Sequence, residues 1–252
     1  MAYYSFKEKY FKFEITMGTK KIGCVIAYRK GHTNYGTSLV GYALIKKIQK
    51  LGYDVEVINY VKRPTLIQKM AWVINAMRCG MGNVISDRLK GVKDLKNNAE
   101  YAANIKIRTD AVEAYKKRKL LPFFKDYVGF KALHDGSKKY DIIIVGSDQI
   151  WTPLSLPTKF FNLLFVDDKV RKVAYASSFG VSSIPEFQKK ATGAYLDRFH
   201  AIGMRELSGK KIVDALSRQT AQVVADPTLL LDSREWSEEI KDSKVKPSEP
   251  YI

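Results

Sequence analysis

The chain has 252 residues, 46% of them hydrophobic, which is enough apolar material for one large α/β domain or two small ones and excludes a disordered or fibrous protein. No apolar run approaches the roughly 18 residues that cross a bilayer, and the opening sequence lacks an apolar segment with a cleavage site. We therefore predict a cytoplasmic protein. Cys24 and Cys79 fall in a predicted strand and a predicted helix, so neither a disulfide framework nor a cysteine zinc site is expected.

The net charge of +17 is concentrated in one region. Residues 61–120 hold fourteen Lys/Arg against five Asp/Glu, a surplus of nine. Such a region can meet nucleic acid, an anionic membrane face, or phosphorylated and acidic sugars, or it can simply be a solvated basic surface. Composition does not choose among these partners.

The first predicted elements form a strand, a helix and a second strand. Residues 1–19 lie outside this pattern and are predicted to be an amino-terminal extension. An apolar strand spans 22–28, a helix with apolar residues at helical spacing spans 35–52, and an alternating, β-branched strand spans 54–60. Short connections between them imply a right-handed parallel crossover, which is half of a doubly wound sheet.

A helical insertion follows at residues 65–120. No proline occurs between Pro64 and Pro122, and apolar residues recur at 4-3-4 spacing. This pattern predicts two or three helices, broken near the sequence CGMGN. The apolar residues at that spacing are Leu66, Met70, Val73 and Met77.

The remainder alternates between strands and helices, which predicts a mainly parallel sheet and a Rossmann-like domain spanning 20–232. The polar, proline-punctuated residues 233–252 are predicted to be a linker toward a second domain. The later predicted elements are strands at 141–145, 170–177, 201–206 and 221–227, with helices at 184–200 and 207–219.

Residues 140–151, YDIIIVGSDQIW, predict a strand that is buried on both faces and carries polar groups at its carboxyl end. Ligands bind at this end of the strands in open α/β sheets. We therefore predict substrate binding by Gly146, Ser147, Asp148 and Gln149; the alternative is that Ser147 and Asp148 only cap the next segment. Trp151 is predicted to be a packing residue.

The sequence GHTNYGTS at residues 31–38 lies between a strand and a helix and nearly matches a phosphate-binding loop, with Thr37 in place of the usual lysine. Backbone N–H groups, two hydroxyls and the helix amino terminus suit an anion. The alternative is an ordinary turn. The substrate-binding candidates here are His32, Asn34, Gly36 and Thr37, although a single loop histidine is more often a surface residue.

A third group of candidates follows the strand at 201–206. Arg205 can bind a carboxylate or phosphate through two parallel hydrogen bonds, and Ser208 and Lys210 follow closely. The alternative is an ion pair between Arg205 and Glu206 or another carboxylate. We find no metal-ligand cluster and no dinucleotide fingerprint, and three scattered histidines give little support to a catalytic triad.

Taken together in this order, the motifs resemble those of the polysaccharide pyruvyl transferases of capsule and exopolysaccharide synthesis. The resemblance covers about residues 20–240 and is carried by NYGTSLVGYAL, LGYDVEVINY, IIIVGSDQIW, MRELSG and VADPTLLLD. It implies the amino-terminal half of a GT-B fold, in which two Rossmann-like domains face each other. It also implies transfer of a pyruvyl group from phosphoenolpyruvate to two sugar hydroxyls as a ketal, with release of phosphate and without a cofactor.

The resemblance assigns donor binding to Arg205, with Ser208 and Lys210 nearby, and an acceptor sugar or lipid-linked oligosaccharide to the two loops before it. Family members carry a second domain that supplies a histidine and a basic residue, and we find no counterpart of the general acid in this sequence. We therefore expect residues 1–252 to fold as an amino-terminal domain that is inactive alone. The oligomeric state stays open.

Two other functions remain possible on these residues. A nucleotide-sugar glycosyltransferase of GT-B architecture would have a similar amino-terminal half. A non-catalytic module that uses residues 65–120 would bind an anionic membrane or nucleic acid, although interleaved aromatic residues and a binding motif are missing, so nucleic acid is not expected. Peripheral contact with an anionic membrane is compatible with all three functions.

Overall fold

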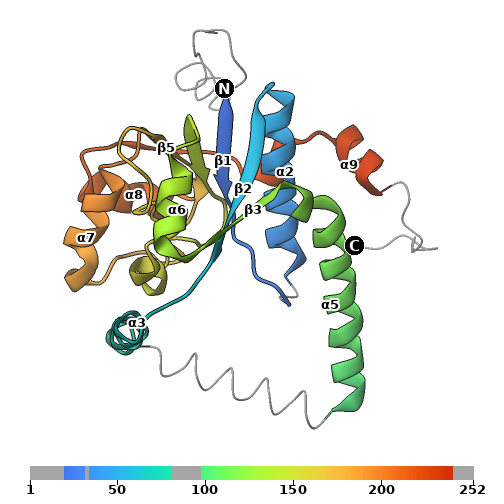
Figure 1. The fold of residues 1–252 in the computed structure, drawn as a ribbon, viewed down its shortest axis with the longest axis horizontal. Coiled ribbons are helices and arrows are strands. Elements are labelled where there is room, and N and C mark those ends of the chain that lie inside the picture. Colours follow the sequence, from blue (N-terminus) through green and yellow to red (C-terminus); the bar gives the residue numbers. More distant parts are fainter. Residues whose placement is uncertain (1–19, 32–33, 81–97, 241–252) are drawn as a thin grey trace.

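A seven-stranded, all-parallel sheet organises the protein. The computed structural model describes residues 20–31, 34–80 and 98–240 (Figure 1). The strand order is β3-β2-β1-β4-β5-β6-β7, so the chain runs outward from β1 in one direction and then from β4 in the other. This arrangement confirms the predicted doubly wound, Rossmann-like fold class. The strands are β1 (Lys21–Val25), β2 (Asp54–Val61), β3 (Phe124–Val128), β4 (Ile142–Val145), β5 (Arg171–Ser177), β6 (Ala201–Met204) and β7 (Ala221–Val223).

Helices cover both faces of this sheet (Figure 1). One face packs against α2 and the end of α5, and the other packs against α6, α7 and α8. Within the described residues, no helix combines the length and hydropathy needed to cross a bilayer. The α-helices are α2 (Tyr35–Lys50), α3 (Leu66–Arg78), α5 (Ala99–Lys119), α6 (Gly129–Ser137), α7 (Glu186–Leu196), α8 (Leu207–Leu216) and α9 (Ser233–Ile240), and short 3₁₀ helices are η1 (Leu121–Phe123), η2 (Pro153–Thr158) and η3 (Pro227–Leu230).

Strand β4 is buried on both faces, as its four consecutive aliphatic residues predict. Ile142 and Ile144 pack in the layer that contains α2, whereas Ile143 and Val145 pack in the layer that contains α7 and α8. The strand therefore joins the two halves of the core at the centre of the sheet.

The predicted insertion contains α3 and α5, and α3 ends just before Cys79, as the predicted helix break requires. The sequence did not predict β3 and α6. Strand β3 is an edge strand whose only buried residue is Tyr127, so it lacks the apolar pattern of a central strand. Burial raises the pKa of the Cys24 thiol to about 12, consistent with a buried structural cysteine.

Residues 233–240 form helix α9, although the sequence predicted that a linker begins there. The side chains of Asp232 and Glu235 each accept a 2.9 Å hydrogen bond from the backbone amide of the other residue, which caps the start of the helix. The sequence contained this capping pattern, but the prediction missed it. Trp236 donates a 3.0 Å hydrogen bond to the Thr228 carbonyl, and Glu239 accepts one of 2.8 Å from Tyr42. These contacts attach α9 to the layer of α2. The predicted extension at residues 1–19 lies outside the described residues.

An ion cluster lies at the amino-terminal end of the sheet, around Glu56. Its carboxylate lies 2.6 Å from the amines of both Lys21 and Lys139 and accepts a 2.8 Å hydrogen bond from the Tyr140 hydroxyl. Burial alone would raise the pKa of Glu56, but these hydrogen bonds lower it to about 2. The cluster therefore stabilises the fold only while Glu56 is ionised.

We expect Glu56→Gln to destabilise the protein by about 1–2 kcal/mol at pH 7, a value reduced from the full pKa shift because the group is partly solvated. Since the folded-state pKa is lowered, the stabilisation is complete above pH 4.5 and is lost as the pH falls from 4.5 toward about 2. Urea denaturation across this range should show the wild type and the variant converging. Asp135→Asn, at a more exposed lysine cluster, is the control, and a pH-independent difference for Glu56→Gln would contradict the assignment.

Candidate functional site

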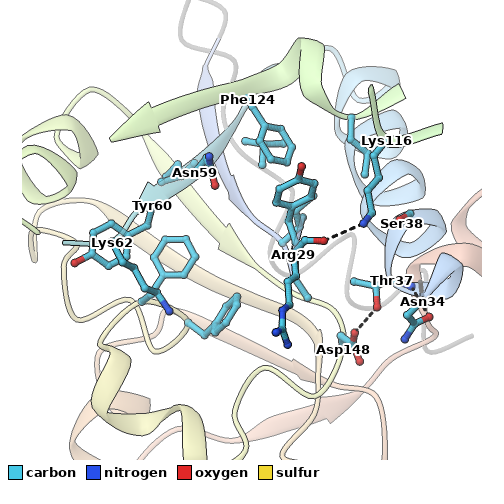
Figure 2. Close-up of a pocket in the computed structure, with 18 residues that line it drawn as sticks. Arg29, Asn34, Thr37, Ser38, Asn59, Tyr60, Lys62, Lys116, Phe124 and Asp148 are labelled. Atoms are coloured by element: carbon cyan, nitrogen blue, oxygen red, sulfur yellow. Dashed lines mark hydrogen bonds between the residues drawn. The ribbon is translucent and has the colours of Figure 1, made fainter. Parts of the chain in front are cut away.

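A cavity of about 500 Å³ lies at the carboxyl ends of β1, β2 and β4 (Figure 2). The strand order reverses between β1 and β4, so the loops that follow them diverge and leave space. The cavity is lined by residues from the ends of these strands, the starts of α2 and β3, the end of α5 and the loop before β5. The residues that carry its chemistry are Tyr28, Arg29, Asn34, Thr37, Ser38, Asn59, Tyr60, Lys62, Lys116, Phe124, Asp148, Phe160 and Phe161.

Two predicted loops, 111 residues apart in sequence, meet in the cavity through Thr37 and Asp148. The Thr37 hydroxyl donates a 2.8 Å hydrogen bond to Asp148 Oδ2, and the Gln149 amide donates one of 2.8 Å to Oδ1. Asn34 caps α2 by accepting a 3.4 Å hydrogen bond from the Thr37 amide. The structure thus brings together three predicted residues, Asn34, Thr37 and Asp148, at the amino terminus of α2.

The Asp148 carboxylate changes the chemistry expected of this loop. The negative charge of Asp148 lies near the first turn of α2, where it interacts favourably with the positive end of the helix dipole. The sequence predicted that this loop suits an anion, but an anionic ligand group would meet the carboxylate. Each Asp148 oxygen retains further capacity to accept a hydrogen bond, so the geometry favours a ligand that donates hydroxyl hydrogens.

Ser38 also lines the cavity and is only 3% exposed. Its hydroxyl has no hydrogen-bond partner among the residues that the structure describes. Leaving a buried hydroxyl unsatisfied costs about 1–3 kcal/mol, which a ligand that reaches Ser38 would recover. Ser38 is therefore a second polar group prepared for a ligand beside the Thr37–Asp148 pair.

Aromatic side chains form much of the remaining wall. The Tyr28 and Phe124 rings meet edge to face with centroids 4.7 Å apart, and the Tyr60 and Phe160 centroids are 5.6 Å apart. Phe160 also lies beside Phe161, at 5.1 Å. A few polar groups among aromatic faces are typical of small-molecule pockets. Such a surface fits a sugar, which presents hydroxyls at its edge and C–H groups on its faces.

The cavity also has cationic residues, and one of them is structural. The buried Lys116 amine donates 2.9 Å hydrogen bonds to the Arg29 carbonyl and to Glu113, which also accepts a 2.8 Å bond from the Gly31 amide. Although burial opposes it, the hydrogen bonds from Lys116 and Gly31 lower the pKa of Glu113. Helix α5 therefore holds the loop after β1 through the hydrogen bonds from Lys116 to the Arg29 carbonyl and from the Gly31 amide to Glu113.

Arg29 and Lys62 provide the exposed positive charge of the cavity. Figure 2 shows the Arg29 side chain extending toward the region of Asp148, whereas Lys62 lies at the opposite side. Local desolvation of the amine lowers the pKa of Lys62, although the residue as a whole is exposed. The cavity thus combines one carboxylate with two accessible cations.

The other predicted residues near β4 support the site and do not line it. Ser147 is buried, and its hydroxyl donates a 2.7 Å hydrogen bond to the Ala176 carbonyl on β5, so this side chain is directed into the core and away from the cavity. Gly146 packs against the backbone of Tyr175, and Gln149 is exposed beside Gly180. Trp151 packs against a cluster of aromatic rings, which confirms its predicted packing role.

The predictions in the first loop have different outcomes. Gly36 lies in the first turn of α2 next to Asn34, where it shapes the start of the helix without lining the cavity. His32 lies outside the described residues.

Arg205 does not line the cavity but lies on the same edge of the sheet. Its amide donates a 3.1 Å hydrogen bond to the Ser177 carbonyl, and Ser177 forms a bridge with Asp148. The guanidinium lies 3.5 Å from Asp226 and 3.7 Å from Glu206, the ion-pair alternative that the sequence left open. These long contacts leave part of its hydrogen-bonding capacity free.

The two residues predicted to assist Arg205 lie on α8. Ser208 is half-buried near the start of this helix, and the Lys210 amine pairs with Asp214 one turn further on. Neither residue lines the cavity.

Several cavity residues were not predicted. Asn59, Tyr60 and Lys62 stand at the carboxyl end of β2, so the rule that identified Asp148 would have found them as well. Phe160 and Phe161 lie in an irregular segment after η2, where periodicity gives no signal. In the part of the chain that the structure describes, no group of three or more His, Cys, Asp or Glu side chains could hold a metal ion.

A comparison with protein families identifies the family of this chain. The sequence model of the family described as polysaccharide pyruvyl transferase matches residues 34–251. No curated protein and no solved structure gives a significant match. The family match begins at the cap of α2 and includes both the Asp148 and the Arg205 loops, and it spans most of the chain. The chain therefore belongs to the polysaccharide pyruvyl transferase family.

Proposed function

We propose that this protein takes part in transferring a pyruvyl group from phosphoenolpyruvate to a sugar in capsule or exopolysaccharide synthesis, on the cytoplasmic side of the membrane. The observation that carries the proposal is the Thr37–Asp148 pair in an aromatic cavity, in a chain that belongs to this family. The acceptor is a sugar, free or as part of a lipid-linked oligosaccharide. The donor is a substrate, and no cofactor takes part.

The reaction joins two acceptor hydroxyls to one carbon. Both hydroxyl oxygens form bonds to C2 of phosphoenolpyruvate, the C2–O bond to phosphate breaks, and the methylene carbon becomes a methyl group. The two acceptor hydroxyls lose two protons in total. The reaction consumes one proton at the methylene carbon, and the second leaves with inorganic phosphate. In this proposal Asp148, which already accepts a hydrogen bond from Thr37, accepts one from an attacking hydroxyl and withdraws its proton as the bond to C2 forms.

Other cavity residues bind and orient the acceptor in this proposal. Ser38 and Asn34 hydrogen-bond sugar hydroxyls, and the rings of Tyr60 and Phe160 pack against C–H faces of the sugar. Arg29 and Lys62 attract an acidic or phosphorylated part of the acceptor.

Arg205 is our candidate for donor binding. Only the end of β5 lies between Arg205 and Asp148, because the backbone of Ser177 pairs with both residues. A guanidinium suits the carboxylate and phosphate of phosphoenolpyruvate, and Ser208 and Lys210 follow it on α8. Donor and acceptor would then lie side by side along the carboxyl ends of β4, β5 and β6.

Thermal-shift titration of the chain tests these assignments without requiring turnover. Phosphoenolpyruvate and a panel of hexose methyl glycosides should each raise Tm. Arg205→Gln should abolish the increase in Tm that phosphoenolpyruvate causes and leave the increase caused by the glycosides. Arg218→Gln, which replaces an exposed arginine paired with Asp197, should leave both increases unchanged. Stabilisation by uridine diphosphate sugars alone would favour a glycosyltransferase. No response to either phosphoenolpyruvate or sugar would contradict the proposal.

A further inference from the structure

Helix α3 presents an apolar surface that the described residues of the domain leave uncovered. Six side chains, Leu66, Ile67, Met70, Val73, Ile74 and Met77, are between 48% and 79% exposed. At 100° per residue these six positions occupy an arc of about 120° on one side of the helix. We name them the α3 apolar face. A contiguous exposed apolar surface of this kind indicates an interaction site.

The opposite side of α3 attaches the helix to the domain. Asn75 is buried, donates a 3.1 Å hydrogen bond to the Pro153 carbonyl and accepts one of 2.6 Å from Gln188. Arg78 lies between that side and the α3 apolar face, and its guanidinium lies over the Phe187 ring, 3.8 Å from the ring centroid. Thr65 and Gln68 form a capping box at the start of the helix. Because the contacts of Asn75 and Arg78 with other segments fix the rotation of α3, its apolar face points away from the domain.

Charge indicates what covers this face. The segment 62–80 contains no acidic residue and carries Lys62, Arg63, Lys69 and Arg78. On the helical wheel, Lys69 and Arg78 fall on opposite edges of the α3 apolar face. Long basic side chains at the edges of an apolar helical face contact anionic headgroups while the apolar residues enter the acyl boundary.

We propose that the α3 apolar face docks on an anionic lipid surface, with α3 lying in the plane of the interface. The helix follows β2 on the carboxyl-end side of the sheet, the side on which the cavity lies (Figure 1). Lys62 lines the cavity and is three residues from the start of the helix cap at Thr65. Docking would thus hold the cavity near the membrane surface. The proposal does not depend on the reaction, but if both hold, the acceptor is lipid-linked.

Cosedimentation of the whole chain with vesicles tests this proposal. We expect binding to vesicles of phosphatidylcholine with about 30% phosphatidylglycerol, and much weaker binding to phosphatidylcholine alone. The triple variant Leu66→Gln, Met70→Gln, Met77→Gln should reduce partitioning at least about tenfold. Raising the salt concentration should also weaken binding, because the basic residues contribute through screened electrostatics.

A matched control distinguishes binding by the α3 apolar face from a general effect of exposed apolar side chains. The control is the triple variant Ile107→Gln, Leu229→Gln, Ile240→Gln. It replaces three apolar side chains outside α3 that are 63–74% exposed, close to the 63–77% of the three side chains replaced in the α3 variant. The control variant should bind vesicles as the wild type does. Circular dichroism should show the same Tm for both triple variants, since all six side chains are exposed. Equal loss of binding in the two variants would overturn the proposal. Failure of the wild type to bind anionic vesicles would also overturn it, and self-association abolished only by the α3 variant would identify a protein interface instead.

Discussion

Asp148→Asn is expected to reduce kcat/KM for ketal formation by about 10²–10⁴-fold, the range for loss of a general base. Asparagine keeps the size of the side chain and tolerates the positive φ of 98° at this position. Its Oδ1 can still accept the hydrogen bond from the Gln149 amide, while its Nδ2 donates to the Thr37 hydroxyl. The loss should therefore come from the missing negative charge and not from unfolding. The measurement is the rate of phosphate release that depends on a sugar acceptor. The variant and the wild type are compared under the conditions in which the wild type is active.

Two further variants make this result specific. Thr37→Val removes the hydrogen bond to Asp148, and the double variant should lose less activity than the sum of the two free-energy changes, because the two side chains act as one unit. Asp110→Asn, which removes an exposed carboxylate on α5, should leave activity unchanged. If Asp148→Asn retains wild-type kcat/KM while Tm is also unchanged, Asp148 has no role in the reaction.

Gly146→Ala is expected to destabilise the protein by at least about 3 kcal/mol, or to prevent folding. A Cβ at this position would lie 1.9 Å from the Tyr175 carbonyl oxygen, and Gly146 has a φ of +149°, which side chains rarely adopt. Relief of the clash would require β4 and β5 to separate at their carboxyl ends, where Asp148 is held. Urea denaturation followed by circular dichroism measures the loss.

Gly52→Ala is the matched control. Gly52 also has a positive φ, of +85°, but no atom lies within 4 Å of its added Cβ. The substitution should therefore cost only about 1 kcal/mol, the conformational cost of a side chain at a helix end that favours glycine. Equal destabilisation by the two variants would show that crowding against Tyr175 is not what requires glycine at position 146.

Local patterns were enough to predict the central sheet. The four aliphatic residues of β4 and the strand-helix-strand pattern of residues 22–60 depend on neighbours in sequence and on burial, so periodicity detects them. The edge strand β3 and the short helix α9 bury few residues. Their positions depend on contacts with distant segments, such as the bond between Glu239 and Tyr42, which periodicity does not report.

The amino-acid sequence by itself determined the doubly wound sheet, the helical insertion, and the two polar loops that follow β1 and β4, because each follows from local patterning and from the geometry of parallel strands. Only the tertiary structure decided which residues of those loops meet. It joined Thr37 to Asp148, directed Ser147 into the core, and left the hydroxyl of Ser38 without a partner in the described part of the chain. It also turned the apolar face of α3 outward, since the rotation of a helix is fixed by a few distant contacts such as those of Asn75 and not by its own periodicity.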